Sequence, residues 1–186
     1  MENTKIIFLR HAHTQKDHLI NAAKWSLSEK GKLQAKKVSE MPILDFIDVI
    51  YVSEEKKTFS TVELLAKKLN KSPQSLSFFN EVKRGDKFFT KEEFELEKIK
   101  QLTDLNYPAF DGERGIDALA RFKRGVEFVA KKNPDKIILI VTHGTILNIY
   151  FSDLLNVYKE LPDRWDKTDF CAIGVVENNK VIQDIC

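Results

Sequence analysis

Two histidines far apart in the chain each follow a run of apolar residues. The run IIFL at residues 6–9 precedes Arg10 and His11, and the run IILIV at residues 137–141 ends two residues before His143. Short apolar runs rich in Ile, Val and Phe are typical of strands buried on both faces of a parallel sheet. Ligands bind outside the carboxyl ends of such strands, where these three side chains would emerge together. Two imidazoles and a guanidinium at one crevice predict an enzyme.

The composition is that of an ordinary soluble globular protein. Of the 186 residues, 42% are hydrophobic and 31% are charged, and the formal net charge is only +2. This balance gives no basis for a nucleic-acid-binding face. The longest apolar run has about five residues, whereas a membrane-spanning helix needs roughly 20, and no secretory signal is visible. The two cysteines lack metal-ligand spacing, so we expect a cytoplasmic protein without a metal or cofactor.

Strand-like and helix-like patterns alternate along most of the chain, which predicts parallel strands joined by right-handed crossovers. We expect strands at residues 4–9, 46–52, 76–79 and 136–142, helices at 28–41, 55–69, 91–102, 116–132 and 146–155, and a closing hairpin at 170–177 and 181–185. The predicted fold is an α/β three-layer sandwich with a mostly parallel central sheet flanked by helices on both faces. A single domain would span residues 1–186, with a lid or insertion at about residues 80–110.

Several short motifs follow one another in an order that is known from one enzyme family. They are LRHAHT at residues 9–14, LSEKG at 27–31, DVIYVS at 48–53 followed by Thr61, Glu81 with Gly85, Gly112-Glu113 with Arg121, and VTHG at 141–144. Together they resemble the signatures of the histidine phosphatase superfamily, the phosphoglycerate mutase-like proteins. The resemblance spans about residues 4–150 and implies a metal-independent phosphatase.

The resemblance also implies roles for individual residues. His11 would attack phosphorus and form a phosphohistidine, while its other ring nitrogen is held by an acceptor such as a backbone carbonyl. Arg10 and His143 would surround the phosphoryl oxygens, and helix amides after Gly144 would favour the same anion. A carboxylic acid must protonate the leaving oxygen, and Glu81 is the first candidate for that role. Alternative proton donors are Glu113 and, more distantly, Asp86.

Departures from the family pattern concern the phosphate pocket. Ala12 stands where glycine is usual, and Asp17 aligns with a frequent asparagine. Lys57 falls where the family places a second arginine. Lysine keeps the positive charge but lacks the planar guanidinium that binds two phosphate oxygens at once. Lys57 either performs a weaker version of that role or is a solvated lysine. Thr14 could donate its hydroxyl to phosphate or cap a local turn.

The leading hypothesis is a phosphomonoester hydrolase that acts through His11 on a small phosphorylated metabolite. The alternatives are a catalytically weakened member that only binds phosphorylated ligands, phosphoglycerate mutase-like phosphoryl transfer, and a phosphatase acting on protein phosphohistidine. The sequence leaves the physiological substrate and the oligomeric state open, because substrate specificity depends on loops whose shape cannot be derived.

Overall fold

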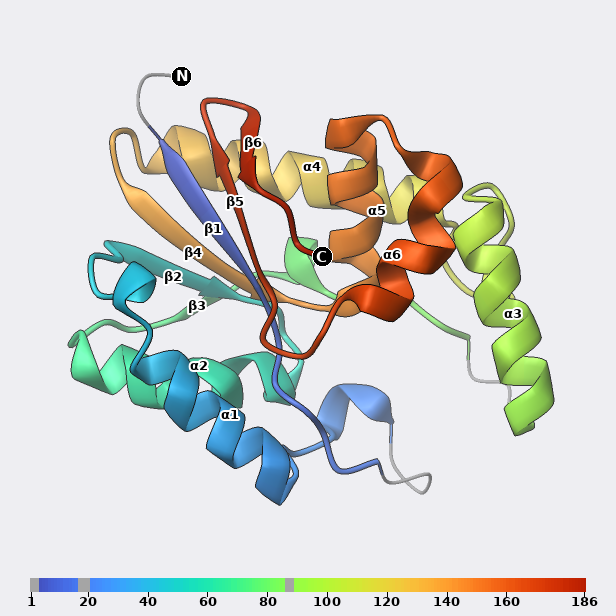
Figure 1. Ribbon diagram of the computed structural model, residues 1–186, viewed down its shortest axis with the longest axis horizontal. Helices are drawn as coiled ribbons and strands as arrows, with labels where there is room; N and C mark the ends of the chain where they lie inside the picture. The colour runs from blue at the N-terminus through green and yellow to red at the C-terminus, as the bar shows by residue number, and fades with distance from the viewer. Residues whose placement is uncertain (1–3, 17–20, 86–88) are drawn as a thin grey trace.

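The computed structural model describes residues 4–16, 21–85 and 89–186, and in these residues six strands form one sheet. The strand order is β3-β2-β4-β1-β5-β6 (Figure 1). The strands are β1 (Lys5–Arg10), β2 (Val49–Val52), β3 (Gln74–Ser75), β4 (Ile137–Thr142), β5 (Ile173–Glu177) and β6 (Lys180–Gln183). The first four in spatial order run parallel, whereas β5 pairs antiparallel with β1 and with β6. The predicted mostly parallel sheet is therefore confirmed.

Helices cover both faces of the sheet, as predicted (Figure 1). They are α1 (Glu29–Ser39), α2 (Lys56–Lys68), α3 (Lys91–Thr103), α4 (Gly115–Lys132), α5 (Gly144–Leu155) and α6 (Leu161–Lys167). Successive side chains of a strand point to opposite faces. Ile7 and Leu9 of β1 therefore pack with the residues of α1 and α2, whereas Ile6 and Phe8 pack with those of α4, α5 and α6. Burial of both faces explains why β1 and β4 are almost continuously apolar.

The segment that was predicted as a lid or insertion contains α3, which lies at the outer end of the α4–α6 layer (Figure 1). Thr90 and Glu93 form a capping box that fixes the start of this helix. The rings of Phe89 and Phe94 pack against Phe110, with centroids 5.4 and 5.0 Å away. These aromatic residues form a small core of their own. The lid function of the segment stays a prediction.

Two details of the predicted elements were wrong. The expected strand at residues 76–79 is instead the short β3 followed by a 3-10 turn at Ser77–Phe79. The chain turns there because the Phe79 ring is fully buried against Tyr51 and Phe122, which places the following residues beside the start of α5. Helix α6 was not predicted. No helix in the described part of the chain combines the length and apolar character needed to cross a bilayer.

Candidate active site

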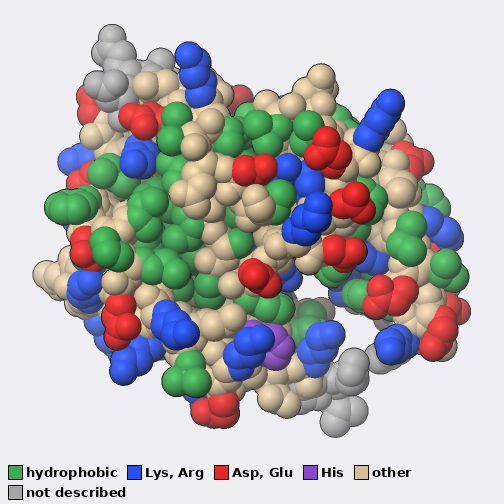
Figure 2. Space-filling model, in the orientation of Figure 1, with side chains coloured by type: hydrophobic (Ala, Val, Ile, Leu, Met, Phe, Trp, Pro, Cys, Tyr) green, Lys and Arg blue, Asp and Glu red, His purple; other side chains and the backbone are tan. Residues whose placement is uncertain are grey.

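The two histidines predicted to meet do lie side by side at the carboxyl ends of β1 and β4. Arg10 pairs with Thr142 in the parallel register, and the backbone N–H of His11 donates to the carbonyl of Thr142 at 2.9 Å. The rings of His11 and His143 are 5.2 Å apart between centroids and inclined by 63°. Both are buried, with 8% and 1% of their surface exposed. In Figure 2 several Lys and Arg side chains and one histidine lie near the lower edge of the face shown, whereas His11 and His143 are almost covered.

His11 is held in a form suited to nucleophilic attack. Its Nδ1 lies 2.8 Å from the carbonyl oxygen of Ala12. Because a carbonyl can only accept, Nδ1 carries the proton and Nε2 keeps its lone pair. The Ala12 N–H donates to the Thr61 hydroxyl at 2.9 Å, which anchors this loop to α2. Burial, followed by the charges of His143, Lys57 and Arg10, lowers the pKa of His11 well below its ordinary value.

Arg10 lies next to His11 in the chain, and its guanidinium contacts an aromatic ring and a backbone carbonyl. Its guanidinium lies 4.3 Å from the ring centroid of Phe170 and donates to the carbonyl of Thr168. Its Nε is buried without a hydrogen-bond partner among the described residues. A Cβ at Gly144 would lie 2.9 Å from the guanidinium carbon of Arg10. Glycine at this position therefore makes room for the arginine, a role that the sequence did not suggest.

Lys57 points into the site rather than into solvent. It is 6% exposed, and its Nζ lies 2.7 Å from Glu55 Oε2 and donates to the carbonyl of Ala22 at 2.8 Å. Glu55 links Lys57 to His143, because the other oxygen of the same carboxylate lies 3.2 Å from Nε2 of His143. The solvated-lysine alternative for Lys57 is therefore wrong.

Glu81 reaches the start of α5, next to His143. Its carboxylate accepts from the N–H groups of Thr145 and Ile146 at 3.0 and 2.9 Å. Burial opposes ionisation, but the charges of His143 and Lys98 and the N–H groups of Thr145 and Val82 lower the pKa of Glu81 to about 2. The helix amides that were expected to bind an anion thus already hold a carboxylate of the protein itself.

The rival acid, Glu113, has a structural partner. Both of its oxygens accept from the guanidinium of Arg121, at 3.0 and 2.8 Å. Arg121 also donates to the carbonyls of Phe78, Asn80 and Glu81. The pair therefore fixes the segment that carries Glu81.

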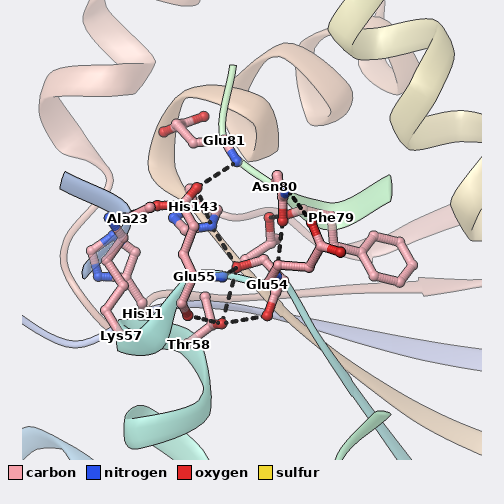
Figure 3. Close-up of polar contacts among 12 residues, drawn as sticks. His11, Ala23, Glu54, Glu55, Lys57, Thr58, Phe79, Asn80, Glu81 and His143 are labelled. Carbon is pink, nitrogen blue, oxygen red and sulfur yellow. Dashed lines mark hydrogen bonds and ion pairs between the residues drawn. The ribbon is translucent and has the colours of Figure 1, made fainter. Parts of the chain in front are cut away.

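Glu55 was missed as a site residue. Its Oε1 lies 3.2 Å from Nε2 of His143 and accepts from the N–H of Glu81 at 3.1 Å (Figure 3). The Ser53 hydroxyl lies 2.8 Å from the same His143 nitrogen. Ser53 belongs to a recognised motif, but glutamates at a helix start are common, and nothing in the pattern singled out Glu55.

Lys98 of α3 was also missed. It is 3% exposed, and its Nζ donates to the Thr145 hydroxyl at 2.6 Å and lies 4.3 Å from the ring centroid of Trp165. Burial lowers its pKa to about 7, although the charge of Glu81 acts in the opposite direction. A lysine within a charged helix gives no signal of such burial, because α3 is dominated by charged residues.

The remaining candidates have weaker links to the pocket. Thr14 is buried and forms an isolated bridge with Leu27, which is a structural role. Asp17 and Asp86 lie outside the described residues. Across residues 4–16, 21–85 and 89–186, no group of three or more His, Cys, Asp or Glu side chains could hold a metal ion.

Comparison with protein families identifies the relatives of this site. The model of the histidine phosphatase superfamily (branch 1) matches residues 6–184. The chain belongs to the histidine phosphatase superfamily. This membership confirms the predicted family and the predicted enzyme class, a histidine-type phosphatase. A comparison with curated protein sequences found no significant match.

Solved structures of the superfamily share the fold. A mycobacterial glucosyl-3-phosphoglycerate phosphatase aligns with a TM-score of 0.80 at 16% identity, covering 100% of both chains. A phosphoserine phosphatase mutant from Entamoeba histolytica, in complex with phosphoserine, aligns with a TM-score of 0.77 at 20% identity, covering 97% of this chain and 94% of its own. Bacillus stearothermophilus YhfR aligns with a TM-score of 0.76 at 18% identity, covering 98% and 96%. At these identities the likeness concerns the fold.

Proposed function

We propose that this protein hydrolyses phosphomonoesters in two steps, with His11 as the nucleophile. The observation that carries the proposal is the pair of buried rings 5.2 Å apart, with the Nδ1 proton of His11 donated to the Ala12 carbonyl. This arrangement points the free lone pair of Nε2 away from the backbone. The lowered pKa of His11 keeps the imidazole neutral at physiological pH.

In the first step, Nε2 of His11 forms a bond to phosphorus while the bond from phosphorus to the ester oxygen breaks. Arg10, His143 and Lys57 stabilise the charge on the phosphoryl oxygens. The leaving oxygen takes a proton from Glu81. Without substrate Glu81 is ionised, because its pKa is about 2. The negative charge of the bound phosphate raises this pKa, and Glu81 takes up a proton from solvent before the ester bond breaks.

In the second step, water attacks the phosphorus of phosphohistidine and the phosphorus–nitrogen bond breaks. Glu81, ionised after the first step, accepts a proton from the attacking water. Inorganic phosphate leaves, and His11 returns to its neutral form. Arg121 acts on this chemistry indirectly, because its contacts with the carbonyls of residues 78, 80 and 81 position Glu81.

The substrate we propose is a small phosphorylated metabolite in the cytoplasm. Support comes from the relatives named above, whose solved complexes include phosphoserine, and from the two free cysteines, Cys171 and Cys186, which suit a reducing compartment. Lys57 in place of arginine favours a second candidate, a member that binds phosphate esters and turns them over slowly or not at all.

Hydrolysis of an aryl phosphate in the presence of a chelator tests the proposal. The parent protein should release phosphate, and His11→Ala should lose at least about a thousandfold in kcat/KM, as expected when a nucleophile is removed. His13→Gln is the matched control. His13 is a histidine only two residues after His11, but its ring bonds to the hydroxyl of Ser28. Protein quenched in alkali during turnover should carry a phosphoryl group that is stable in base and labile in acid. Full activity of His11→Ala would disprove the proposal.

A further inference from the structure

We propose that the carboxylate of Glu55 occupies the position of the substrate's phosphoryl oxygens, so that every phosphate ester must displace it to bind. The inference rests on the proposed function in one respect only, that phosphate binds at His143 and Lys57. If every phosphate ester must displace Glu55, this residue helps to set the affinity of the site for anions.

The contacts of Glu55 are those expected of a bound anion. Oε2 lies 2.7 Å from Nζ of Lys57, and Oε1 lies 3.2 Å from Nε2 of His143. Oε1 also accepts the backbone N–H of Glu81 at 3.1 Å. A cationic side chain, an imidazole and a backbone N–H are the donors with which proteins grip phosphoryl oxygens. In Figure 3 the Glu55 side chain lies between these groups.

The position of Glu55 in the chain allows it to leave. It is the residue immediately before α2 and has extended backbone angles, φ −84° and ψ 129°, so the helix does not depend on its side chain. The Glu55 side chain makes no capping hydrogen bond to the helix amides; only its backbone carbonyl accepts one, from the N–H of Thr58 at 3.0 Å. Rotation of the side chain can therefore release the carboxylate while Lys57 and His143 stay in place.

Glu55 carries its negative charge at neutral pH. Burial favours the neutral acid, but the charges of His143 and Lys57 and the hydrogen bonds to Glu55 outweigh it and lower the pKa of Glu55. The ionisable groups that face it are Lys57 on its own helix, His143 after β4, and Glu81 and Arg84 on the segment after Phe79. A phosphate dianion and this carboxylate cannot share the same donors without repulsion.

Displacement of the Glu55 carboxylate would free hydrogen-bond donors of Lys57. An ammonium group has three protons, and Lys57 directs two of them to Glu55 and to the carbonyl of Ala22. When Glu55 withdraws, two protons of Lys57 become available to phosphate instead of one. The departure of Glu55 would thus partly offset the loss of the arginine that the family usually has at this place.

Calorimetric titration with inorganic phosphate tests the proposal on the parent protein, Glu55→Gln and Glu55→Ala. The matched control is Glu54→Gln, because Glu54 is an exposed neighbour whose carboxylate bonds to Asn80 outside the pocket. Removing the competing charge should tighten phosphate binding about tenfold or more in both Glu55 variants, and the control should bind as the parent does. Thermal melting with and without phosphate, read on the same samples, shows that each variant is folded.

Three outcomes would overturn the proposal: unchanged phosphate affinity in both folded Glu55 variants, equal tightening by Glu54→Gln, or no phosphate binding by any of the four proteins. A fall in kcat of a hundredfold or more with unchanged KM would overturn it as well, because Glu55 would then be a proton donor. Failure of the proposed function looks different. Tighter phosphate binding by the Glu55 variants of a protein without turnover would support the role of Glu55 and disprove the hydrolase.

Discussion

Substitution of Lys98 by Met should change how the stability of the protein depends on pH. Lys98 is 3% exposed, and burial lowers its pKa from 10.5 to about 7. Near neutral pH the amine of Lys98 is therefore fully protonated in the unfolded chain but only partly protonated in the folded protein. Because the unfolded state binds more protons, the free energy of unfolding rises with pH from about 7 towards 10.5.

The expected size follows from that pKa. When the unfolded state binds one more proton than the folded state, the free energy of unfolding rises by about 1.4 kcal/mol per pH unit. The slope is smaller near pH 7, because Lys98 in the folded protein is then still half protonated. Between pH 7 and pH 9 the contribution is about 2 kcal/mol. Methionine has a similar length and no charge, so Lys98→Met should lack this increment. The stability of the parent relative to the variant should therefore increase by that amount over the interval.

Urea denaturation of both proteins at several pH values measures this difference, and other titrating groups cancel in the comparison. Lys100 provides the control, because it lies on the same helix but is exposed and paired with Glu97. Lys100→Met should show no comparable divergence from the parent. A difference between parent and Lys98→Met that stays constant from pH 7 to pH 9 would refute the assignment of Lys98 as a buried, partly neutral amine.

Two further predictions concern the supports of the site. Gly144→Ala should weaken phosphate binding about tenfold with little change in melting temperature, because its Cβ would displace the Arg10 guanidinium, 2.9 Å away. Calorimetry with phosphate checks this, and an unchanged affinity would contradict it. Arg121→Met should lower the free energy of unfolding by about 3 kcal/mol, since it leaves the partly buried Glu113 carboxylate with only the backbone N–H of Lys83 as a partner. Chemical denaturation measures the loss, and Arg114→Met, an exposed arginine of the adjoining turn, should lose much less.

The sequence was sufficient to predict the fold and the proximity of the two histidines. Apolar runs at 6–9 and 137–141 can be buried only in a sheet covered on both faces, and parallel pairing then places His11 and His143 at the same edge. The predicted starts of the helices at residues 28–41 and 91–102 agree with the structure, where the side chains of Ser28 and Thr90 cap α1 and α3 through contacts within a few residues. The predicted strands and helices were correct where the local conformational preference of the residues agreed with their tertiary packing.

Weak local signals explain the errors in the predicted elements. The run at 76–79 has the composition of a strand, yet it lies at the edge of the sheet, where little pairing holds it extended. The burial of Phe79 there outweighs the strand preference. Helix α6 contains only seven residues, too few for an apolar period to stand out.

The electrostatics of the pocket were decided by the tertiary structure alone. Glu55, Lys57 and Lys98 are ordinary charged residues in the sequence, and each could have pointed into solvent. Their burial follows from the packing of α2 against β4 and of α3 against α6 and the start of α5, which are segments distant in sequence. Charge–charge energies depend on distance and burial, neither of which has a periodic signature in a sequence. The sequence thus determined which residues could react, and the fold determined which charges surround them.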